Sequence, residues 1–373
     1  MAVKSRQKRN IIIRSVLKYL GRLLAVVAAL VIIIGVVLIS AVYMISTSSC
    51  ETVKSLFVNT MVETGALDFC AYMFLDEAAV NEIVAQNQMV VPEEKTDTSK
   101  IIIGDVSDPE KKEEQEKQTK SEDERLGIVY NEEGVCLLNV KGKTYEGKIL
   151  IVKDPTRVHV TGLEKYGTGI VGKTTEQMAI DCDALAAING GGYAEMSDYK
   201  TGGIPEGREQ GGVVIIDGEL RWGSLNTSYE FIGFDENHLL YVDTMTAAEA
   251  LKIGIVEAVN WGPVLVKNGE PCVVQGTSTN PGFHPRSAIG QRADGSIILL
   301  VIDGRQAQSM GASYDDLVEI MVNYGAVNAA NLDGGMSSYM YYDGEIVTSP
   351  YMLYFNGKRT VATSFIVTRS KNS

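Results

Sequence analysis

The longest run of hydrophobic positions lies near the N-terminus, where residues 23–45 are uncharged and almost wholly apolar. Residues 1–22 before it carry seven Lys and Arg residues and no acidic residue. At a rise of about 1.5 Å per residue, a helix of this length crosses a hydrocarbon core about 30 Å thick. Because basic flanks favour the cytoplasmic side, we predict a single-pass cell-membrane anchor with residues 1–22 cytoplasmic and the remainder extracellular. A cleaved signal peptide is the alternative, which the length of the apolar block disfavours.

The hydrophobic pattern then changes twice before the main folded region begins. Residues 46–90 carry apolar positions at roughly helical spacing, which predicts a short helical stalk close to the membrane. Residues 91–125 are charged, mixed in sign and nearly free of aromatic side chains. This composition is typical of a solvated, disordered linker.

From Leu126 onward, short β-rich runs alternate with Gly, Asn and Asp, which is typical of strands joined by turns. Three segments have a helical pattern instead, at 174–184, 246–251 and 313–324, and Ser313 can cap the last of them with Asp316 in a capping box. We therefore predict one α+β domain over 126–373, with a mixed, sheet-rich architecture and few helices. The predicted strands include 135–140, 148–152, 157–160, 212–216, 231–234, 238–242, 263–266, 297–302 and 326–332.

Composition narrows the class of function. The 373-residue chain carries a formal net charge of −13 and has no basic patch interleaved with aromatics, so a nucleic-acid partner is not expected. Its five cysteines are odd in number and widely spaced, which fits neither a disulfide framework nor a zinc site. Cys50 and Cys70 could pair outside the cell, although spacing alone does not show it. No ligand spacing requires a metal, and we expect no cofactor.

Three segments share one sequence pattern, in which an apolar strand is followed by a polar residue and then glycine. Each is explained on its own by ordinary turn chemistry. Three in one domain suggest instead that strand ends gather around a common cleft, where the glycines let a ligand approach the backbone. The three sequences are Asn189-Gly190-Gly191, Asp303-Gly304-Arg305 and Asp333-Gly334-Gly335.

The polar residues of these motifs are suited to glycosidic chemistry on a charged substrate. Cleavage of a glycosidic bond uses a proton donor and a second carboxylate, for which Asp303 and Asp333 are the natural pair. Arginine binds phosphate through a bidentate fork, and Arg286 and Arg305 are candidates, although either could pair with a neighbouring Asp. His284 adjoins Arg286 and could donate a proton or bind phosphate.

Taken together, these motifs resemble the phosphodiester glycosidase family. The likeness runs from about Leu126 to the C-terminus and ends in a segment, Arg359-Thr360-Val361-Ala362, that is similar to the family's closing strand. Two positions depart from the family pattern and leave the substrate open: Gly192-Tyr193 replaces an aromatic pair, and Met336 replaces a glycine. The motifs are Ala187-Ile188-Asn189-Gly190-Gly191, Gly202-Gly203-Ile204-Pro205-Glu206-Gly207, Asn260-Trp261-Gly262-Pro263, His284-Pro285-Arg286-Ser287-Ala288-Ile289-Gly290, Val301-Ile302-Asp303-Gly304-Arg305 and Asn331-Leu332-Asp333-Gly334-Gly335 followed by Ser337-Ser338.

The resemblance implies hydrolysis of a sugar 1-phosphodiester at the anomeric carbon, on a surface glycan or wall polymer. Two other functions stay open: a non-catalytic glycan-binding or exopolysaccharide assembly factor, and a metal-dependent phosphodiesterase that cuts the P–O bond. The expected catalytic residues are Asp333, Asp303 and Arg286, and the expected substrate-binding residues are Asn189, Gly190, Gly191, His284, Arg305, Gly334, Gly335 and Ser337.

Overall fold

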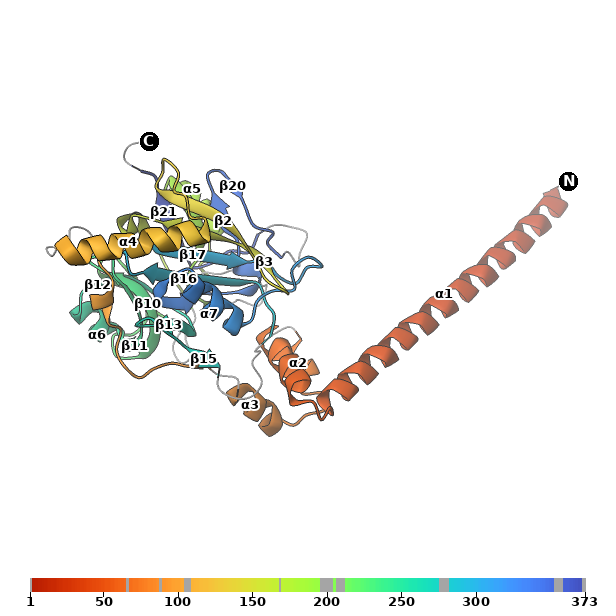
Figure 1. Cartoon of the computed structure of the whole chain (residues 1–373). Helices are drawn as coiled ribbons and strands as arrows, with labels where there is room; N and C mark the ends of the chain where they lie inside the picture. Colours follow the sequence, from red (N-terminus) through yellow and green to blue (C-terminus); the bar gives the residue numbers. More distant parts are fainter. Residues whose placement is uncertain are drawn as a thin grey trace. The chain divides into compact units, whose positions relative to one another are not determined.

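The chain folds as two compact units in a computed structural model, one over residues 1–84 and one over residues 85–373 (Figure 1). We describe each unit by itself. The structure describes residues 2–64, 67–86, 89–103, 109–167, 169–194, 204–205, 212–274, 282–351 and 358–370.

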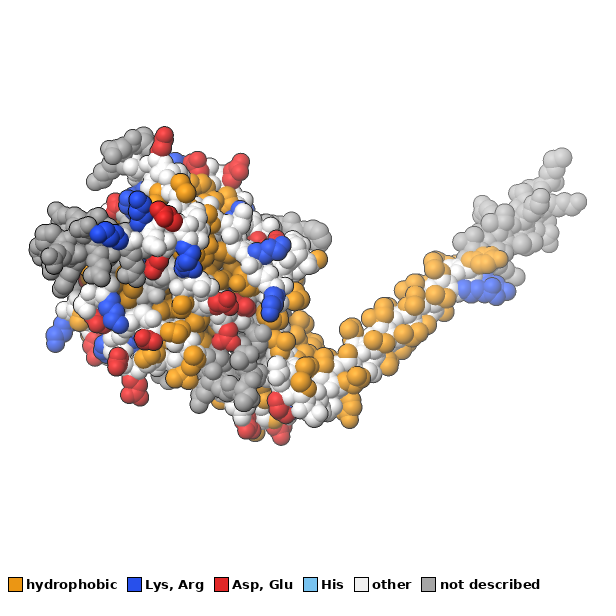
Figure 2. Space-filling model, viewed as in Figure 1, with side chains coloured by type: hydrophobic (Ala, Val, Ile, Leu, Met, Phe, Trp, Pro, Cys, Tyr) orange, Lys and Arg blue, Asp and Glu red, His pale blue; other side chains and the backbone are white. Residues whose placement is uncertain are grey.

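The first unit consists of a long helix followed by a small helical cluster. Helix α1 spans Ala2–Ser46, and its part from Leu17 to Ser46 is long and apolar enough to cross a membrane, a property that signal sequences share. Hydrophobic side chains cover the described part of α1 on the face shown in Figure 2. Helices α2 (Glu51–Thr64) and α3 (Glu77–Ala85) and the short 3₁₀ helix η1 (Asp68–Cys70) follow it.

The second unit begins with a segment that we call the N-terminal strap, residues 89–103. Its strand β1 (Met89–Val90) pairs with β15 (Val273–Val274), and its 3₁₀ helix η2 covers Thr98–Lys100. Helix α4 (Pro109–Leu126) then runs along the outside of the sheet assembly (Figure 1). The sequence predicted a disordered linker over 91–125, whereas the strap and the C-terminal end of α4 make polar contacts with the rest of the domain.

Polar side chains buried in the domain explain this difference. The Lys267 ammonium, only 3% exposed, donates to the carbonyl oxygen of Pro92 at 3.2 Å. The Asp243 carboxylate accepts from the backbone N–H of Thr96 at 3.1 Å. The buried Arg292 guanidinium binds the carboxylate of Asp123 on α4 at 2.9 Å. Backbone groups of the strap and a carboxylate of α4 are therefore partners for charged groups that the domain buries.

Three antiparallel sheets form the body of the second unit, and the α+β class predicted from the sequence is confirmed. Their strand orders are β14-β13-β18-β16-β17-β3-β2, β20-β19-β5-β21-β4 and β11-β10-β12-β8-β9. A further short pair joins β6 (Tyr193–Ala194) and β7 (Ile204–Pro205). The strands are β2 (Val135–Lys141), β3 (Glu146–Val152), β4 (Val158–Gly162), β5 (Ala184–Asn189), β8 (Val214–Ile216), β9 (Glu219–Trp222), β10 (Ser228–Asp235), β11 (Leu240–Thr246), β12 (Ile255–Asn260), β13 (Val264–Lys267), β14 (Glu270–Pro271), β16 (Arg286–Arg292), β17 (Ile297–Ile302), β18 (Ala326–Asn331), β19 (Met340–Tyr342), β20 (Glu345–Ile346) and β21 (Thr363–Thr368).

The seven-stranded sheet is buried on both faces, which is why β17 is a continuous apolar run in the sequence. On one face, Leu299 and Val301 pack with Phe365 and Ile188 of the second sheet and Phe234 of the third. On the other face, the alternate residues of β17 pack against helix α7 (Tyr314–Asn323). This central sheet positions the strand ends that carry the candidate site.

The three helices predicted within the domain are confirmed, two with slightly shorter bounds and one shifted by a single residue. They are α5 (Thr175–Asp181), α6 (Ala247–Lys252) and α7. Each begins with a capping box, including the one predicted between Ser313 and Asp316. The capping side chains satisfy backbone N–H groups that the first helical turn leaves without partners.

A histidine–carboxylate pair links two of the sheets and gives stability a pH dependence. His159 on β4 lies with its Nδ1 3.0 Å from Glu257 Oε1 on β12, and this hydrogen bond raises the pKa of His159 above its usual value. A raised histidine pKa stabilises the fold fully below the unfolded-state value of about 6.5, and this contribution is lost as pH rises through the folded-state pKa.

We therefore expect Glu257→Gln to lower the free energy of unfolding by about 1–2 kcal/mol at pH 5.5, and by less at pH 8.5. Urea denaturation of both proteins at the two pH values measures the difference. An equal loss of stability at both values would show that the charge on His159 is not involved.

Candidate active site

Three strand termini that are distant in sequence meet within the domain. Strand β5 ends at Asn189, strand β18 ends just before Leu332 and Asp333, and strand β16 begins at Arg286. The N–H of Leu332 donates to the carbonyl oxygen of Ser287 at 2.8 Å. Of the three motifs predicted to gather, those of Asn189 and Asp333 meet here, together with the start of β16 at Arg286.

Asn189 fixes the backbone at Asp333. Its side chain is fully buried, and its Nδ2 donates to the carbonyl oxygen of Asp333 at 2.6 Å. Its Oδ1 accepts from the Ser287 hydroxyl at 2.6 Å, and the Asp333 N–H donates to the carbonyl oxygen of Gly190 at 3.2 Å. We expected Asn189 to bind substrate, but these protein partners make it a positioning residue for Asp333.

The glycines after Asn189 are required by close packing within the protein. A Cβ atom at Gly190 would lie 2.4 Å from Thr363 Oγ1, and one at Gly191 would lie 2.6 Å from the carbonyl oxygen of Asn260. The Gly191 N–H also donates to Thr363 Oγ1 at 3.1 Å. The space that we expected these glycines to open for a ligand is occupied by neighbouring strands.

Gly334 and Gly335 form the turn that follows Asp333. A Cβ atom at Gly334 would lie 3.0 Å from the carbonyl oxygen of Pro285. Gly335 has φ +65°, which favours glycine, and a Cβ atom there would lie 3.7 Å from Arg305 Nη1. The turn thus brings the Asp333 segment beside the Arg305 guanidinium.

Two arginines form the cationic side of the site, and a buried histidine lies beside them. The Arg286 guanidinium lies 4.2 Å from the centre of the Tyr314 ring, and its Nε donates to the carbonyl oxygen of Ala312 at 3.3 Å. Arg305 Nη2 lies 3.3 Å from His284 Nδ1. Burial, reinforced by the charges of Arg286 and Arg305, lowers the pKa of His284 to about 2.

His284 is therefore neutral at physiological pH. Because a guanidinium only donates hydrogen bonds, Nδ1 of His284 is the acceptor and its proton lies on Nε2. The residue can orient Arg305 and donate one hydrogen bond, but it cannot supply the proton of an imidazolium. The sequence left two roles open for His284, proton donation and phosphate binding. The lowered pKa of His284 and the two neighbouring arginines favour anion binding.

Tyr193, Ser337 and Arg359 lie on the Asp333 side of the site. The Tyr193 hydroxyl lies 3.1 Å from Ser337 Oγ, and the Arg359 guanidinium lies 5.1 Å from the centre of the Tyr193 ring. Burial and the charge of Asp333 raise the pKa of Tyr193, so the phenol stays protonated. Neither Tyr193 nor Arg359 was predicted as a site residue, although both lie in segments that carried the family resemblance.

Asp303 is not joined to the rest of the cluster. Its Oδ1 accepts from the Ser349 N–H at 2.8 Å, and its electrostatic partners are Glu146 and Lys148 of the β3 strand. Among the described residues, its carboxyl group contacts neither Arg286 nor Asp333. The predicted pairing of Asp303 with Asp333 is therefore not present in the structure.

We expect Asp303→Asn to retain most activity, because the amide oxygen can still accept from Ser349. Burial raises the pKa of Asp303, so ionisation of this carboxyl destabilises the fold as pH rises from the unfolded-state pKa through the folded-state value. The variant should be at least as stable as the parent at pH 7, and this advantage should disappear at low pH. Thermal unfolding at pH 3 and pH 7, with parallel assays, tests both statements.

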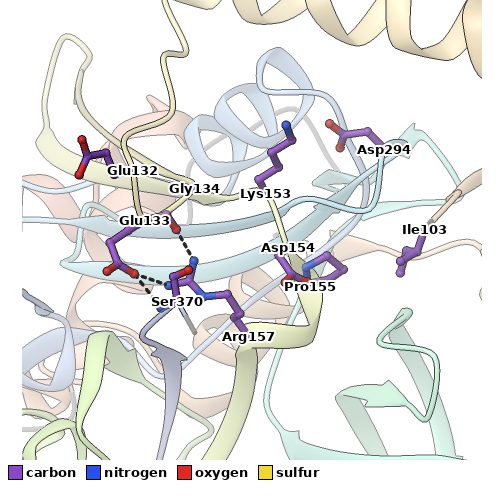
Figure 3. A pocket seen from close by; sticks show the side chains of 10 residues that line it. All are labelled: Ile103, Glu132, Glu133, Gly134, Lys153, Asp154, Pro155, Arg157, Asp294 and Ser370. Atoms are coloured by element: carbon purple, nitrogen blue, oxygen red, sulfur yellow. Dashed lines mark hydrogen bonds and ion pairs between the residues drawn. The ribbon is translucent and has the colours of Figure 1, made fainter. Parts of the chain in front are cut away.

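A pocket of about 460 Å³ lies elsewhere on the domain (Figure 3). The Arg157 guanidinium beside it is held by Glu133 and by the carbonyl oxygen of Thr368. The predicted site residues are absent from its lining, which consists of Ile103, Glu132, Glu133, Gly134, Lys153, Asp154, Pro155, Arg157, Asp294 and Ser370. Within the described parts of the chain, no cluster of three or more His, Cys, Asp or Glu side chains could hold a metal ion.

Comparison with known proteins agrees with the fold and with the motifs. The chain is 36% identical over 91 residues to the SPbeta prophage-derived uncharacterized protein YomE of Bacillus subtilis, covering 24% of this chain and 14% of that protein. It is 26% identical over 189 residues to the N-acetylglucosamine-1-phosphodiester alpha-N-acetylglucosaminidase of Bos taurus, covering 48% of this chain and 34% of that enzyme. The chain thus spans well under two thirds of either relative.

The zebrafish N-acetylglucosamine-1-phosphodiester alpha-N-acetylglucosaminidase catalytic domain, auto-inhibited by its pro-peptide, has a similar fold. Its TM-score is 0.51 at 21% sequence identity, over 63% of this chain and 82% of that chain. Residues 183–368 match the family model described as phosphodiester glycosidase, and they contain every residue of the candidate site. The resemblance drawn from the motifs is confirmed, and the chain belongs to the phosphodiester glycosidase family.

Proposed function

We propose that the domain hydrolyses a sugar 1-phosphodiester by breaking the bond between the anomeric carbon and the phosphate oxygen. The observation that carries this proposal is the cluster in which Arg286, Arg305 and neutral His284 lie beside the Gly334-Gly335 turn that follows Asp333. Family membership supplies the reaction type, and the cluster supplies a cationic side and a carboxylate in one part of the domain.

The arginines suit the charge that develops in this reaction. A phosphodiester carries one negative charge, and the departing phosphomonoester gains a second as the C1–O bond breaks. Guanidinium groups that are fixed in advance stabilise such developing charge without reorganisation. Stacking on Tyr314 and the contact with His284 hold Arg286 and Arg305 in place.

In this proposal Asp333 acts on the sugar. A carboxylate beside the anomeric carbon stabilises the positive charge of the sugar cation and can accept a proton from the attacking water. The water oxygen then bonds to C1, and the free sugar and the phosphomonoester leave. Because a phosphate group leaves readily as an anion, this reaction places less demand on a second carboxylate acid than cleavage of an ordinary glycoside does. This agrees with the separation of Asp303 from the cluster.

We further propose a surface glycan or wall polymer with sugar-phosphate links as the substrate, and an extracellular location for the domain. Both rest on the N-terminal apolar helix and its basic flank, which suit a membrane anchor.

Product identity tests the proposed reaction. The fragment from Ala85 to Ser373 is incubated with a panel of sugar 1-phosphodiesters in water enriched in ¹⁸O. C1–O cleavage predicts free sugar that carries the label, with an unlabelled phosphomonoester. Labelled phosphate, sugar phosphate as product and sensitivity to chelator would instead identify a metal-dependent phosphodiesterase. Saturable binding without any product would identify a glycan-binding protein.

A further inference from the structure

Residues 67–74 of the first unit, which we call the aromatic segment, expose an unusual amount of apolar surface. Phe69 is 56% exposed, Tyr72 43% and Phe74 38%, and Leu67 and Met73 are exposed to a similar degree. Contiguous exposed patches of large apolar side chains on a protein mark a binding surface for another protein or a membrane.

The exposure follows from how the segment is attached to its own cluster. Ala71 is fully buried and packs with Val58 of α2 and Val80 of α3. This small side chain provides the segment's contact with the centre of the cluster, while the large side chains on either side of it remain outside. The apolar surface is therefore not a displaced part of the cluster's own core.

A ring contact places the aromatic segment at one end of the apolar helix. Tyr43 and Phe74 form an edge-to-face pair, with ring centroids 5.3 Å apart and an interplanar angle of 79°. Tyr43 belongs to the last turn of the candidate span Leu17–Ser46, of whose residues only Ser46 is buried within the protein. A bilayer that surrounds this helix and ends near Ser46 would reach Phe74 at the same depth.

Side-chain chemistry also fits this depth. Tyrosine and other aromatic residues are enriched at the boundary between headgroups and acyl chains, where one end of the ring is apolar and the other is wet. The segment contains two Phe, one Tyr, one Met and one Leu, with Asp68 as its only charged residue. A single exposed acid at the rim of such a segment can remain in the headgroup water.

We propose that the aromatic segment inserts into the outer headgroup boundary of the bilayer that α1 crosses. The helical cluster then lies flat against the membrane through a second, monotopic contact instead of standing away from it as a stalk. This inference is independent of the catalytic proposal, because no residue of the second unit takes part in it.

Spin-label depth measurements on the full chain in lipid nanodiscs test this insertion. Cys50, Cys70 and Cys182 are replaced by Ala, and the buried Cys136 and Cys272 are kept. Labels are then attached singly at F69C, at Y72C and at N81C, the last on an exposed position of α3. Collision with oxygen, which concentrates in lipid, is compared with collision with a water-soluble nickel chelate.

Insertion predicts that labels at positions 69 and 72 collide several-fold more with oxygen relative to nickel than the label at position 81 does. The contrast should vanish in proteins that also carry F74E, because this substitution brings a charge to the same segment. If labels 69 and 72 behave like label 81, the segment faces water and the proposal fails. If they are shielded from both agents, another protein surface covers the segment and the proposal fails as well.

Discussion

Replacing Asp333 with Asn should reduce kcat/KM for a sugar 1-phosphodiester by about 10²–10⁴-fold, the range typical of losing a positioned acid–base group. The amide keeps the size of the carboxylate but removes its negative charge and its ability to accept a proton. If Asp333 acts chiefly on the transition state, most of the loss will appear in kcat and little in KM.

The fold should tolerate this substitution because the protein holds Asp333 through its backbone. Its N–H donates to Gly190 and its carbonyl oxygen accepts from Asn189, and both contacts survive a side-chain change. Thermal unfolding should therefore show a midpoint close to that of the parent. A loss of activity that accompanied a large loss of stability would not count as evidence for catalysis.

Asp343→Asn is the matched control. Asp343 is exposed in the turn between β19 and β20, where its φ of +44° is one that Asn tolerates. The same chemical change there should leave the rate within a few-fold of the parent. If Asp333→Asn also retained parental activity, the carboxylate would not be part of the reaction, and the proposed mechanism would be wrong.

Local patterns predicted the elements of the domain well because each pattern has a local physical cause. The apolar run of β17 reflects burial on both faces, and the Ser313–Asp316 pair satisfies the N–H groups at the start of α7. Two of the three strand-then-glycine motifs, those of Asn189 and Asp333, lie at strand termini that meet.

The roles of individual residues were harder to predict because they depend on partners distant in the sequence. Whether a glycine faces a ligand or a neighbouring strand is decided at Gly190 by Thr363, which only the folded sheet brings near. The two Asp-Gly motifs look equivalent, yet Ser349 holds the carboxyl group of Asp303, away from the arginine cluster. A strand-end motif fixes the place of a backbone turn, but the face on which its side chain lies depends on the whole fold.

The same reasoning explains why the N-terminal strap was not recognised. Its charged composition predicts disorder, and nothing within residues 89–103 indicates a partner. The partners are buried groups more than 140 residues away: Lys100 donates to the carbonyl oxygen of Asn268, and the Asp97 N–H donates to Asn268 Oδ1. The composition of a segment indicates how much apolar surface it can bury. It does not indicate which buried polar groups elsewhere in the domain use the segment as a hydrogen-bond partner.

A fragment that begins at Leu126 should therefore be much less stable than one that begins at Ala85. Without the strap, Asp243 and Lys267 keep each other at 3.2 Å but lose the Thr96 N–H and the Pro92 carbonyl, and a hydrogen bond to a charged group contributes about 1.5–3 kcal/mol. Without α4, Arg292 loses Glu122 and Asp123 and keeps the more distant Asp294 at 3.7 Å, so the loss should approach the cost of breaking a buried ion pair, about 3–5 kcal/mol. The total approaches the whole stability of an ordinary domain, about 5–15 kcal/mol.

Urea denaturation of three fragments separates these contributions. The fragment from Ala85 should have the highest midpoint, and a fragment from Pro109, which keeps α4 but lacks the strap, should be intermediate. The fragment from Leu126 should unfold at the lowest urea concentration or fail to fold. Equal midpoints for the Ala85 and Leu126 fragments would show that strap and helix add nothing to the domain, and that their contacts with Lys267, Asp243 and Arg292 are replaced by water at no cost.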